Sequence, residues 1–195
     1  MNPDLFYSRI QQAVPLETAP RHQAFSVLHA EILAEYNSAV SSISSARAEN
    51  VSSDGRSLKQ VVGHIMEWDR FMIQAAGELL SGVLDPQMMS LKGFHHLEGM
   101  TQDFETIDGF NAFHAAEQEG QAWTQIQSRA VACARILHRL FSTPGLLEGS
   151  LLDATAPVTL SFKGGIKMKS STGWQLWIIV MEHEGVEHMT DLSQV

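Results

Sequence analysis

The sequence predicts an all-α protein, a four-helix bundle with a small β-hairpin between the third and fourth long helices. Three observations support this fold class. Apolar residues recur at steps of three and four along three long segments, which is the period of a helix with one buried face. A fourth segment near the end of the chain is almost continuously apolar. Between the third and fourth segments the period changes to two, which is typical of strands.

Composition limits the class of protein. The chain has 195 residues, 44% of them hydrophobic, and we expect a single domain over 1–195 with residues 1–19 as an N-terminal arm. The single cysteine, Cys133, excludes an internal disulfide. A net charge of −9 disfavours binding to nucleic acid. Neither a membrane-spanning run nor a secretory signal is recognisable, so we expect a cytoplasmic protein that does not bind membranes.

The N-terminal arm is expected to form one short helix from Pro3 to Ala13, because proline suits a first helical position. Its buried side would comprise Leu5, Phe6 and Ile10. Pro15 and Pro20 would separate this helix from the first long one. That long helix is predicted to begin after Pro20 and to run to about Ser45.

The second long helix is predicted to begin at Ser57, where SLKQ has the form of a capping box with Gln60. His64 falls at the margin of its apolar face, where a histidine can be shielded and still point into a groove between helices. The commoner alternative is a border histidine bonded to a carbonyl group. Asp69 falls at the opposite margin, where we expect it to have a polar partner of its own.

The connection from Gly82 to Asp108 is long and holds the adjacent His95 and His96. Loops of this length are uncommon unless they are functional or disordered, so a lid over the helices is one interpretation. Adjacent histidines on a loop are poorly organised as metal ligands, which makes this pair a weaker candidate than His64. The third long helix is predicted from Asp108–Asn111 to about Ser142, before a Pro-Gly pair stops it.

The hairpin is expected within VTLSFKGGIKMKS, and its loop length decides which side chains share a face. A three-residue loop, Lys163 to Gly165, pairs Phe162 with Ile166 and Leu160 with Met168. All the apolar side chains then lie on one face of the hairpin. A two-residue Gly-Gly turn would mix apolar and charged residues, so the three-residue loop is favoured.

The last apolar segment, Trp174 to Leu192, carries the most specific chemistry. It contains two pairs with i, i+4 spacing, His183 with Glu187 and Glu184 with His188. Residues four apart share one helical face, and imidazole with carboxylate suits zinc, nickel or iron. His183 and His188 are five apart, or about 140° on a regular helix, so they cannot share one cation there. The alternative is a polar helix end exposed to water.

Three motifs together resemble the DinB/YfiT-like superfamily of metal-binding four-helix bundles. They are SLKQVVGHIMEWDRF in the second long helix, DGFNAF at the start of the third and EGVEHMTDL in the last. The resemblance implies one divalent metal held by His64, Glu184 and His188. The family usually has histidine where this chain has Glu184. Two alternatives are a local bulge that rotates His183 inward and a degenerate site without metal.

The resemblance also implies a function. We expect a metal-dependent thiol transferase or hydrolase that acts on a small molecule, with a low-molecular-weight thiol as a candidate cofactor and a homodimer as a candidate assembly. Glu187 or Asp191 would orient a ligand or act as a base. The rival hypothesis is a non-catalytic bundle that binds a hydrophobic or electrophilic ligand, or that dimerises through its helices.

Overall fold

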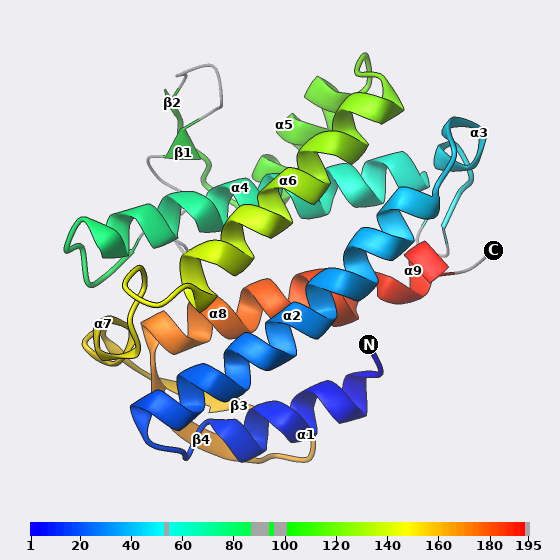
Figure 1. The fold of residues 1–195 in the computed structure, drawn as a ribbon. Helices are drawn as coiled ribbons and strands as arrows, with labels where there is room; N and C mark the ends of the chain where they lie inside the picture. Colours follow the sequence, from blue (N-terminus) through cyan, green and yellow to red (C-terminus); the bar gives the residue numbers. More distant parts are fainter. Residues whose placement is uncertain (53–54, 87–93, 96–100, 194–195) are drawn as a thin grey trace.

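The structure is a computed structural model that describes residues 1–52, 55–86, 94–95 and 101–193. The described part of the chain is mostly helical and carries two antiparallel sheets of two strands each (Figure 1). The helices are α1 (Pro3–Ala13), α2 (Thr18–Ser42), α3 (Ser45–Ala48), α4 (Leu58–Leu80), α5 (Ile107–Gln118), α6 (Trp123–Ser142), α7 (Gly149–Asp153), α8 (Thr172–Glu182) and α9 (Met189–Ser193). A π-helix, η2 (His183–Glu187), joins α8 to α9. The strands are β1 (Phe94–His95), β2 (Thr101–Gln102), β3 (Pro157–Ser161) and β4 (Lys167–Ser171).

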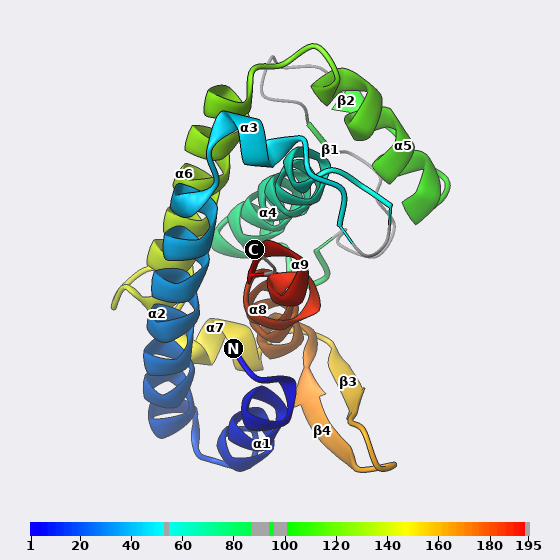
Figure 2. The same cartoon turned by 90° about the vertical axis from the view of Figure 1, so that its right-hand side faces the viewer.

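The long helices pack around one another. Helix α6 lies against both α4 and α2, η2 lies against α2, and α8 lies against α4 (Figures 1 and 2). One part of the core surrounds Trp174 and Trp177 of α8, whose rings are stacked with centroids 6.0 Å apart. The other part surrounds Tyr36 of α2 and Ile65 of α4. Helix α8 therefore lies in the interior, which explains why its sequence is apolar all round.

Helix α1 has the predicted bounds, but one residue of its predicted buried side is wrong. The side chain of Asn2 caps the helix by accepting from the amides of Asp4 and Leu5. Phe6 and Ile10 are buried, whereas Leu5 is 53% exposed. Successive residues are rotated by about 100° on a helix, so Leu5 cannot join the face that Phe6 and Ile10 share.

Helix α2 begins at Thr18, earlier than predicted, and ends at Ser42. Pro20 is its third residue rather than its boundary. The first four amides of a helix have no partner within it, so a proline in the first turn removes no hydrogen bond. The predicted capping box at the start of α4 is confirmed. The side chains of Ser57 and Gln60 each accept a hydrogen bond from the backbone amide of the other residue.

The segment predicted as one third helix is two helices, α5 and α6, which meet at residues 119–122 (Figure 2). Packing against α4 holds α5 in a direction different from that of α6. Gln118 donates from Nε2 to the carbonyl oxygen of Gly63 at 3.1 Å. A Cβ atom on Gly63 would lie 2.0 Å from Oε1 of Gln118, so the contact requires glycine. Gly120, a weak helix former, was the sequence signal for the break.

The predicted hairpin is confirmed, including its register. Leu160 pairs with Met168, and the amide of Phe162 donates to the carbonyl of Ile166 at 2.8 Å. Gly164 and Gly165 have φ values of 86° and 79°, which only glycine adopts readily. Of the connection from Gly82 to Asp108, the structure describes the pairing of β1 with β2, whereas His96 and the side chain of His95 lie outside the described residues. The lid interpretation depends largely on that undescribed part.

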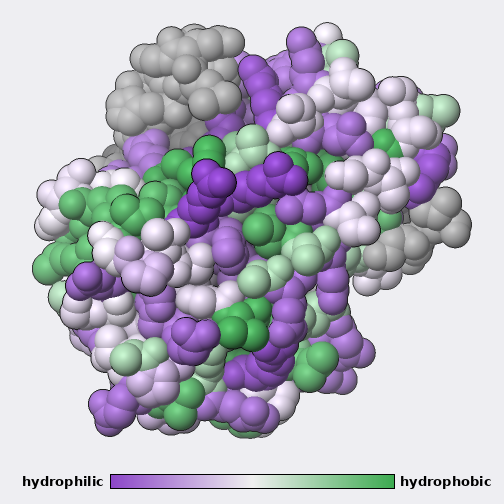
Figure 3. Space-filling view, in the orientation of Figure 1, coloured by the Kyte–Doolittle hydropathy of each residue, from purple (hydrophilic) through white to green (hydrophobic). Residues whose placement is uncertain are grey.

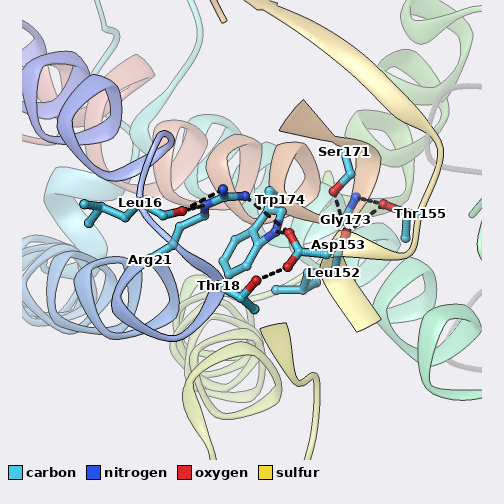
Figure 4. A network of polar contacts seen from close by, with 9 residues as sticks. All are labelled: Leu16, Thr18, Arg21, Leu152, Asp153, Thr155, Ser171, Gly173 and Trp174. Atoms are coloured by element: carbon cyan, nitrogen blue, oxygen red, sulfur yellow. Dashed lines mark hydrogen bonds and ion pairs between the residues drawn. The ribbon is translucent and has the colours of Figure 1, made fainter. Parts of the chain in front are cut away.

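A polar network fixes the start of α8 (Figure 4). The indole of Trp174 donates to Asp153 at 2.6 Å, and Thr18 donates to the other carboxylate oxygen of Asp153. Ser171 donates to the carbonyl of Leu152 at 2.5 Å. The network ties α2, α7 and α8 together, and it sets the direction in which α8 leads to η2.

No helix among the described residues is long and apolar enough to cross a bilayer. On the face seen in Figure 3, hydrophobic residues are interspersed with hydrophilic ones.

The close approach of α7 to α8 gives a test of the packing. A Cβ atom on Gly173 would lie 2.7 Å from the backbone of Leu152, which cannot move aside as a side chain can. We expect Gly173→Ala to lower the free energy of unfolding by about 1–3 kcal/mol in a urea titration. Gly77→Ala is the control, because nothing lies within 4 Å of that position in α4. The control should be neutral or more stable by up to about 1 kcal/mol; equal losses in both variants would contradict the packing argument.

Candidate metal centre

The last helical segment changes its winding at His183. Residues 183–187 form a π turn, in which the hydrogen bonds span five residues instead of four, so residues five apart come to lie on one side of the helix. His183 opens this turn, and His188 follows its last residue. The two histidines therefore face the same way, which a regular α-helix would prevent.

His64 of α4 completes a group of three histidines. Its Nε2 atom lies 3.3 Å from Nε2 of His183. The ring centroids are 5.1 Å apart for His64 and His188, and 5.0 Å apart for His183 and His188. One ligand atom from each ring lies within 4.8 Å of the other two. Nitrogen ligands of a tetrahedral zinc ion are roughly 3.3 Å apart, given bonds of about 2.0–2.1 Å, so the three histidines could hold a metal ion.

Glu184, the expected middle ligand, lies outside this group. Its Oε2 atom is 3.3 Å from Nε2 of His29 on α2, and both side chains are fully buried. Nδ1 of His29 accepts from the indole of Trp177 at 2.9 Å. Because an indole only donates, the proton of neutral His29 resides on Nε2 and is donated to Glu184.

The structure thus brings together two of the expected ligands, His64 and His188, and adds His183 in place of Glu184. The physical reason is the extra residue in the π turn, which rotates His183 toward α4 and leaves Glu184 directed at α2. This arrangement is the bulge that the sequence left open as an alternative.

Close packing accompanies the π turn. A Cβ atom on Gly185 would lie 2.8 Å from Cγ2 of Ile32, so η2 approaches α2 more closely than another residue would allow. The amino group of Met1 donates to the carbonyl of Gly185 at 2.8 Å. This hydrogen bond satisfies a carbonyl of the π turn from outside the helix.

The electrostatics suit a metal ligand. Burial holds the pKa of His183 well below its usual value, and the neighbouring His64, His188 and Arg56 lower it further. A histidine binds metal through the lone pair of the neutral ring. The depressed pKa keeps that lone pair available at neutral pH.

Two buried carboxyl groups lie near the histidines. Burial raises the pKa of Glu184 well above its usual value, and burial together with Glu184 raises the pKa of Asp69. Oδ2 of Asp69 has no hydrogen-bond partner among the residues that the structure describes, so the expected polar partner is not found there. A buried carboxyl without a cation nearby favours its neutral form.

A cavity of about 450 Å³ opens beside the three histidines. Its apolar wall is formed by Trp68, Met72, Ile107, Ile179 and Val180. Its polar lining includes Arg56, Asn111 and Glu187. A second cavity of about 250 Å³ between α4 and α5 shares Arg56, His64 and Asn111 with the first. The volume of the first cavity is in the range of small-molecule sites, about 300–1,000 Å³.

Glu187 and Asp191, the two acidic residues expected to orient a ligand or act as a base, lie in different surroundings. Glu187 lies at the rim of the cavity, where burial and Glu182 raise its pKa and Arg56 lowers it. Asp191 is buried, and its backbone amide donates to the carbonyl of His188 at 3.1 Å. Sequence reasoning missed two residues of the cavity. Arg56 lies in a connector, and Asn111 lies on α5 within the DGFNAF motif, which did not mark it as part of a site.

Comparison of the chain with protein-family models, with curated proteins and with solved structures gave no match.

Metal titration tests which residues are ligands. We expect the purified, metal-free protein to bind one zinc ion, and His64→Ala, His183→Ala or His188→Ala to weaken binding by more than the roughly 10- to 100-fold typical of outer partners. Glu184→Gln is the matched control, because it keeps the buried volume and should change zinc affinity little. Calorimetric titration of each variant measures the effect. Loss of binding in Glu184→Gln with retention in His183→Ala would assign the ligand to Glu184 instead.

The buried carboxyl of Asp69 predicts a dependence of stability on pH. Its folded-state pKa is raised, so the folded protein keeps a proton that the unfolded chain releases above about pH 4. The free energy of unfolding of the wild type therefore falls relative to that of Asp69→Asn as the pH rises. The slope is up to about 1.4 kcal/mol per pH unit, until the carboxyl ionises in the folded state. Urea unfolding of the metal-free proteins at pH 4, 6 and 8 should show that the stability of the variant relative to wild type rises steadily with pH.

Asp85→Asn is the control for this measurement, because Asp85 is exposed and lies outside the helices. Its difference from wild type should stay nearly constant over the same pH range. A constant difference for Asp69→Asn as well would show that Asp69 is ionised in the folded protein at all three pH values.

Proposed function

We propose that the protein is a divalent-metal-dependent enzyme that acts on a small molecule, of the hydrolase or thiol-transferase type. One observation carries the proposal: His64, His183 and His188 converge from two helical segments beside a cavity large enough for a substrate. A purely structural histidine cluster would not need an adjacent cavity with an apolar wall and separate polar groups.

The donor set fits a metal with an open position. Three imidazole nitrogens suit zinc, nickel or iron, and three protein ligands are the usual number in catalytic zinc sites. When bound there, such a cation supplies Lewis acidity that activates a water or a thiol.

The other residues of the cavity have roles that follow from their positions. The side chains of Trp68, Met72 and Ile179 form an apolar wall that limits the access of water to the histidines. Glu187 at the rim has a raised pKa, which makes its carboxylate a stronger base than a fully exposed one. We propose that Glu187 accepts the proton of the nucleophile.

We also propose that the chain is a four-helix bundle related to the DinB/YfiT-like superfamily. The order of α2, α4, α6 and the α8–η2–α9 segment supports this relationship, as does the hairpin before α8. The superfamily usually has histidine as its middle ligand, and His183 supplies a histidine here from a position five before His188 instead of four. A low-molecular-weight thiol is the cofactor that the relationship implies.

Metal reconstitution tests the proposed activity. The metal-free protein would be loaded separately with zinc, nickel and ferrous iron, then assayed for hydrolysis of p-nitrophenyl acetate and for transfer of cysteine or glutathione to monochlorobimane. We expect activity with at least one metal, its loss on chelation, and a decrease of roughly 100-fold or more in His183→Ala. Glu184→Gln, which leaves the three histidines in place, should retain activity.

The same assays distinguish a metal-dependent enzyme from a non-catalytic helical bundle. Activity that persists without metal, or that His183→Ala leaves unchanged, would contradict a metal-dependent enzyme. Failure of the protein to bind any of the three metals would favour the non-catalytic bundle.

A further inference from the structure

We propose that His29 is a positioning residue for the candidate metal centre. Its imidazole holds Trp177 and Glu184 on one side of the last helical segment and thereby keeps the extra residue of the π turn on the C-terminal side of Glu184. In that winding His183, and not Glu184, is presented to His64. This inference rests on the proposed function in one respect, that the three histidines form a metal site. It assigns a role to a histidine that lies outside that group.

His29 joins two positions on the last helical segment. Its Nδ1 atom accepts from the indole of Trp177 at 2.9 Å, and its Nε2 atom lies 3.3 Å from Oε2 of Glu184. All three side chains are buried, so water does not compete for these contacts. Because an indole only donates, the neutral imidazole carries its proton on Nε2 and donates it to Glu184. The ring is therefore held at both of its nitrogen atoms.

The spacing of the two partners determines the winding between them. Glu184 follows Trp177 by seven residues, and seven steps of about 100° return to within about 20° of the starting direction. Both side chains therefore reach one imidazole only if the intervening segment is a regular α-helix. An extra residue between them would turn Glu184 away from α2 by about 100°. The amide of His183 donates to the carbonyl of Ile179, four residues earlier, as regular winding requires.

The position of the extra residue decides which side chain joins His64 and His188. When it follows Glu184, His183 and His188 are five apart across the π turn and share one side. When it precedes Glu184, the segment from Glu184 to His188 is regular, and these two residues share a face at a spacing of four. Glu184 then has the direction that His183 has in the structure. The contacts of His29 exclude this second arrangement.

Packing from other helices supports the same winding. Ile32 lies one turn along α2 from His29, and a Cβ atom on Gly185 would lie 2.8 Å from Cγ2 of Ile32. The ring of His138 on α6 packs edge to face against that of His29, with the centroids 5.0 Å apart. This contact limits rotation of the imidazole away from Glu184.

Loss of His29 favours the second arrangement. Oε1 of Glu184 has no hydrogen-bond partner among the residues that the structure describes, and Oε2 has His29. Without the imidazole, the buried carboxyl has lost its donor, which costs free energy. A metal ion held by His64 and His188 would attract that carboxylate and favour the winding that brings Glu184 to it.

Exchange of the ligand set tests this role of His29. Zinc affinity is measured by calorimetry for His183→Ala and Glu184→Gln, each in the wild-type chain and in His29→Leu. In the wild-type chain, His183→Ala should weaken binding by roughly 100-fold or more and Glu184→Gln by less than roughly 10-fold. In His29→Leu the order should reverse, so that Glu184→Gln causes the larger loss. A role of His29 in stability alone would leave the order unchanged.

The matched variants keep or remove the two contacts. His29→Gln carries one acceptor for the indole of Trp177 and one donor for Glu184, so it should retain the wild-type order of losses. If His29→Leu does not fold, His29→Asn takes its place, because its shorter polar side chain does not reach Glu184. A folded His29→Leu or His29→Asn in which zinc binding still depends on His183 overturns the inference.

Crystal structures of the metal-free proteins give a readout that does not depend on zinc. We expect the π turn of residues 183–187 in the wild type and in His29→Gln, and its loss or displacement to before Glu184 in His29→Leu. An unchanged π turn in His29→Leu contradicts the positioning role. The two proposals also fail separately. A wild type that binds no zinc, with winding that changes in His29→Leu, contradicts the metal-dependent function alone, whereas zinc binding through His183 with or without His29 contradicts the positioning role alone.

Discussion

The π turn of residues 183–187 is the constraint on which the candidate metal centre depends. One additional residue in a single turn moves His183 to the side of His188 and toward His64, while Glu184 is directed to α2. A π turn has poorer hydrogen-bond geometry than an α turn, so neighbouring contacts must favour it. Gly185, packed against Ile32, is one such contact, and a metal bound by both histidines would be another.

The same turn divides the polar residues into two groups with different chemistry. The histidines face a cavity and have access to a ligand. Glu184 is enclosed in the core with His29, where burial keeps His29 neutral, with a pKa lowered to about 3, and raises the pKa of the Glu184 carboxyl. Asp69 is also buried and its pKa is raised, but it belongs to the lining of the cavity. A buried polar layer of this kind costs stability unless every group is paired.

Helix α5 makes the site a cavity rather than an open groove. It departs from α6 at residues 119–122 and is held on α4 by Gln118, which contacts Gly63 and Glu67. Asn111 and Ile107 reach the cavity only because α5 has this direction. Gly63, the residue before His64, is therefore a glycine because Gln118 packs against it. The same packing positions α5, which forms the second wall of the cavity.

The sequence by itself determined the elements whose signals are local. The capping box at Ser57 and the three-residue hairpin loop follow from turn chemistry and from the spacing of apolar residues, and the structure agrees with both. His64 and His188 were expected as ligands from the resemblance to a family, and the structure places both in the group of three histidines that could hold a metal ion. Tertiary packing brings His183, and not Glu184, beside His64 and His188, because contacts with α2 and α4 set the winding of the last helical segment. Arg56 and Asn111 likewise line one cavity with His64 only through folding, since no local pattern relates a connector to a helix about fifty residues away.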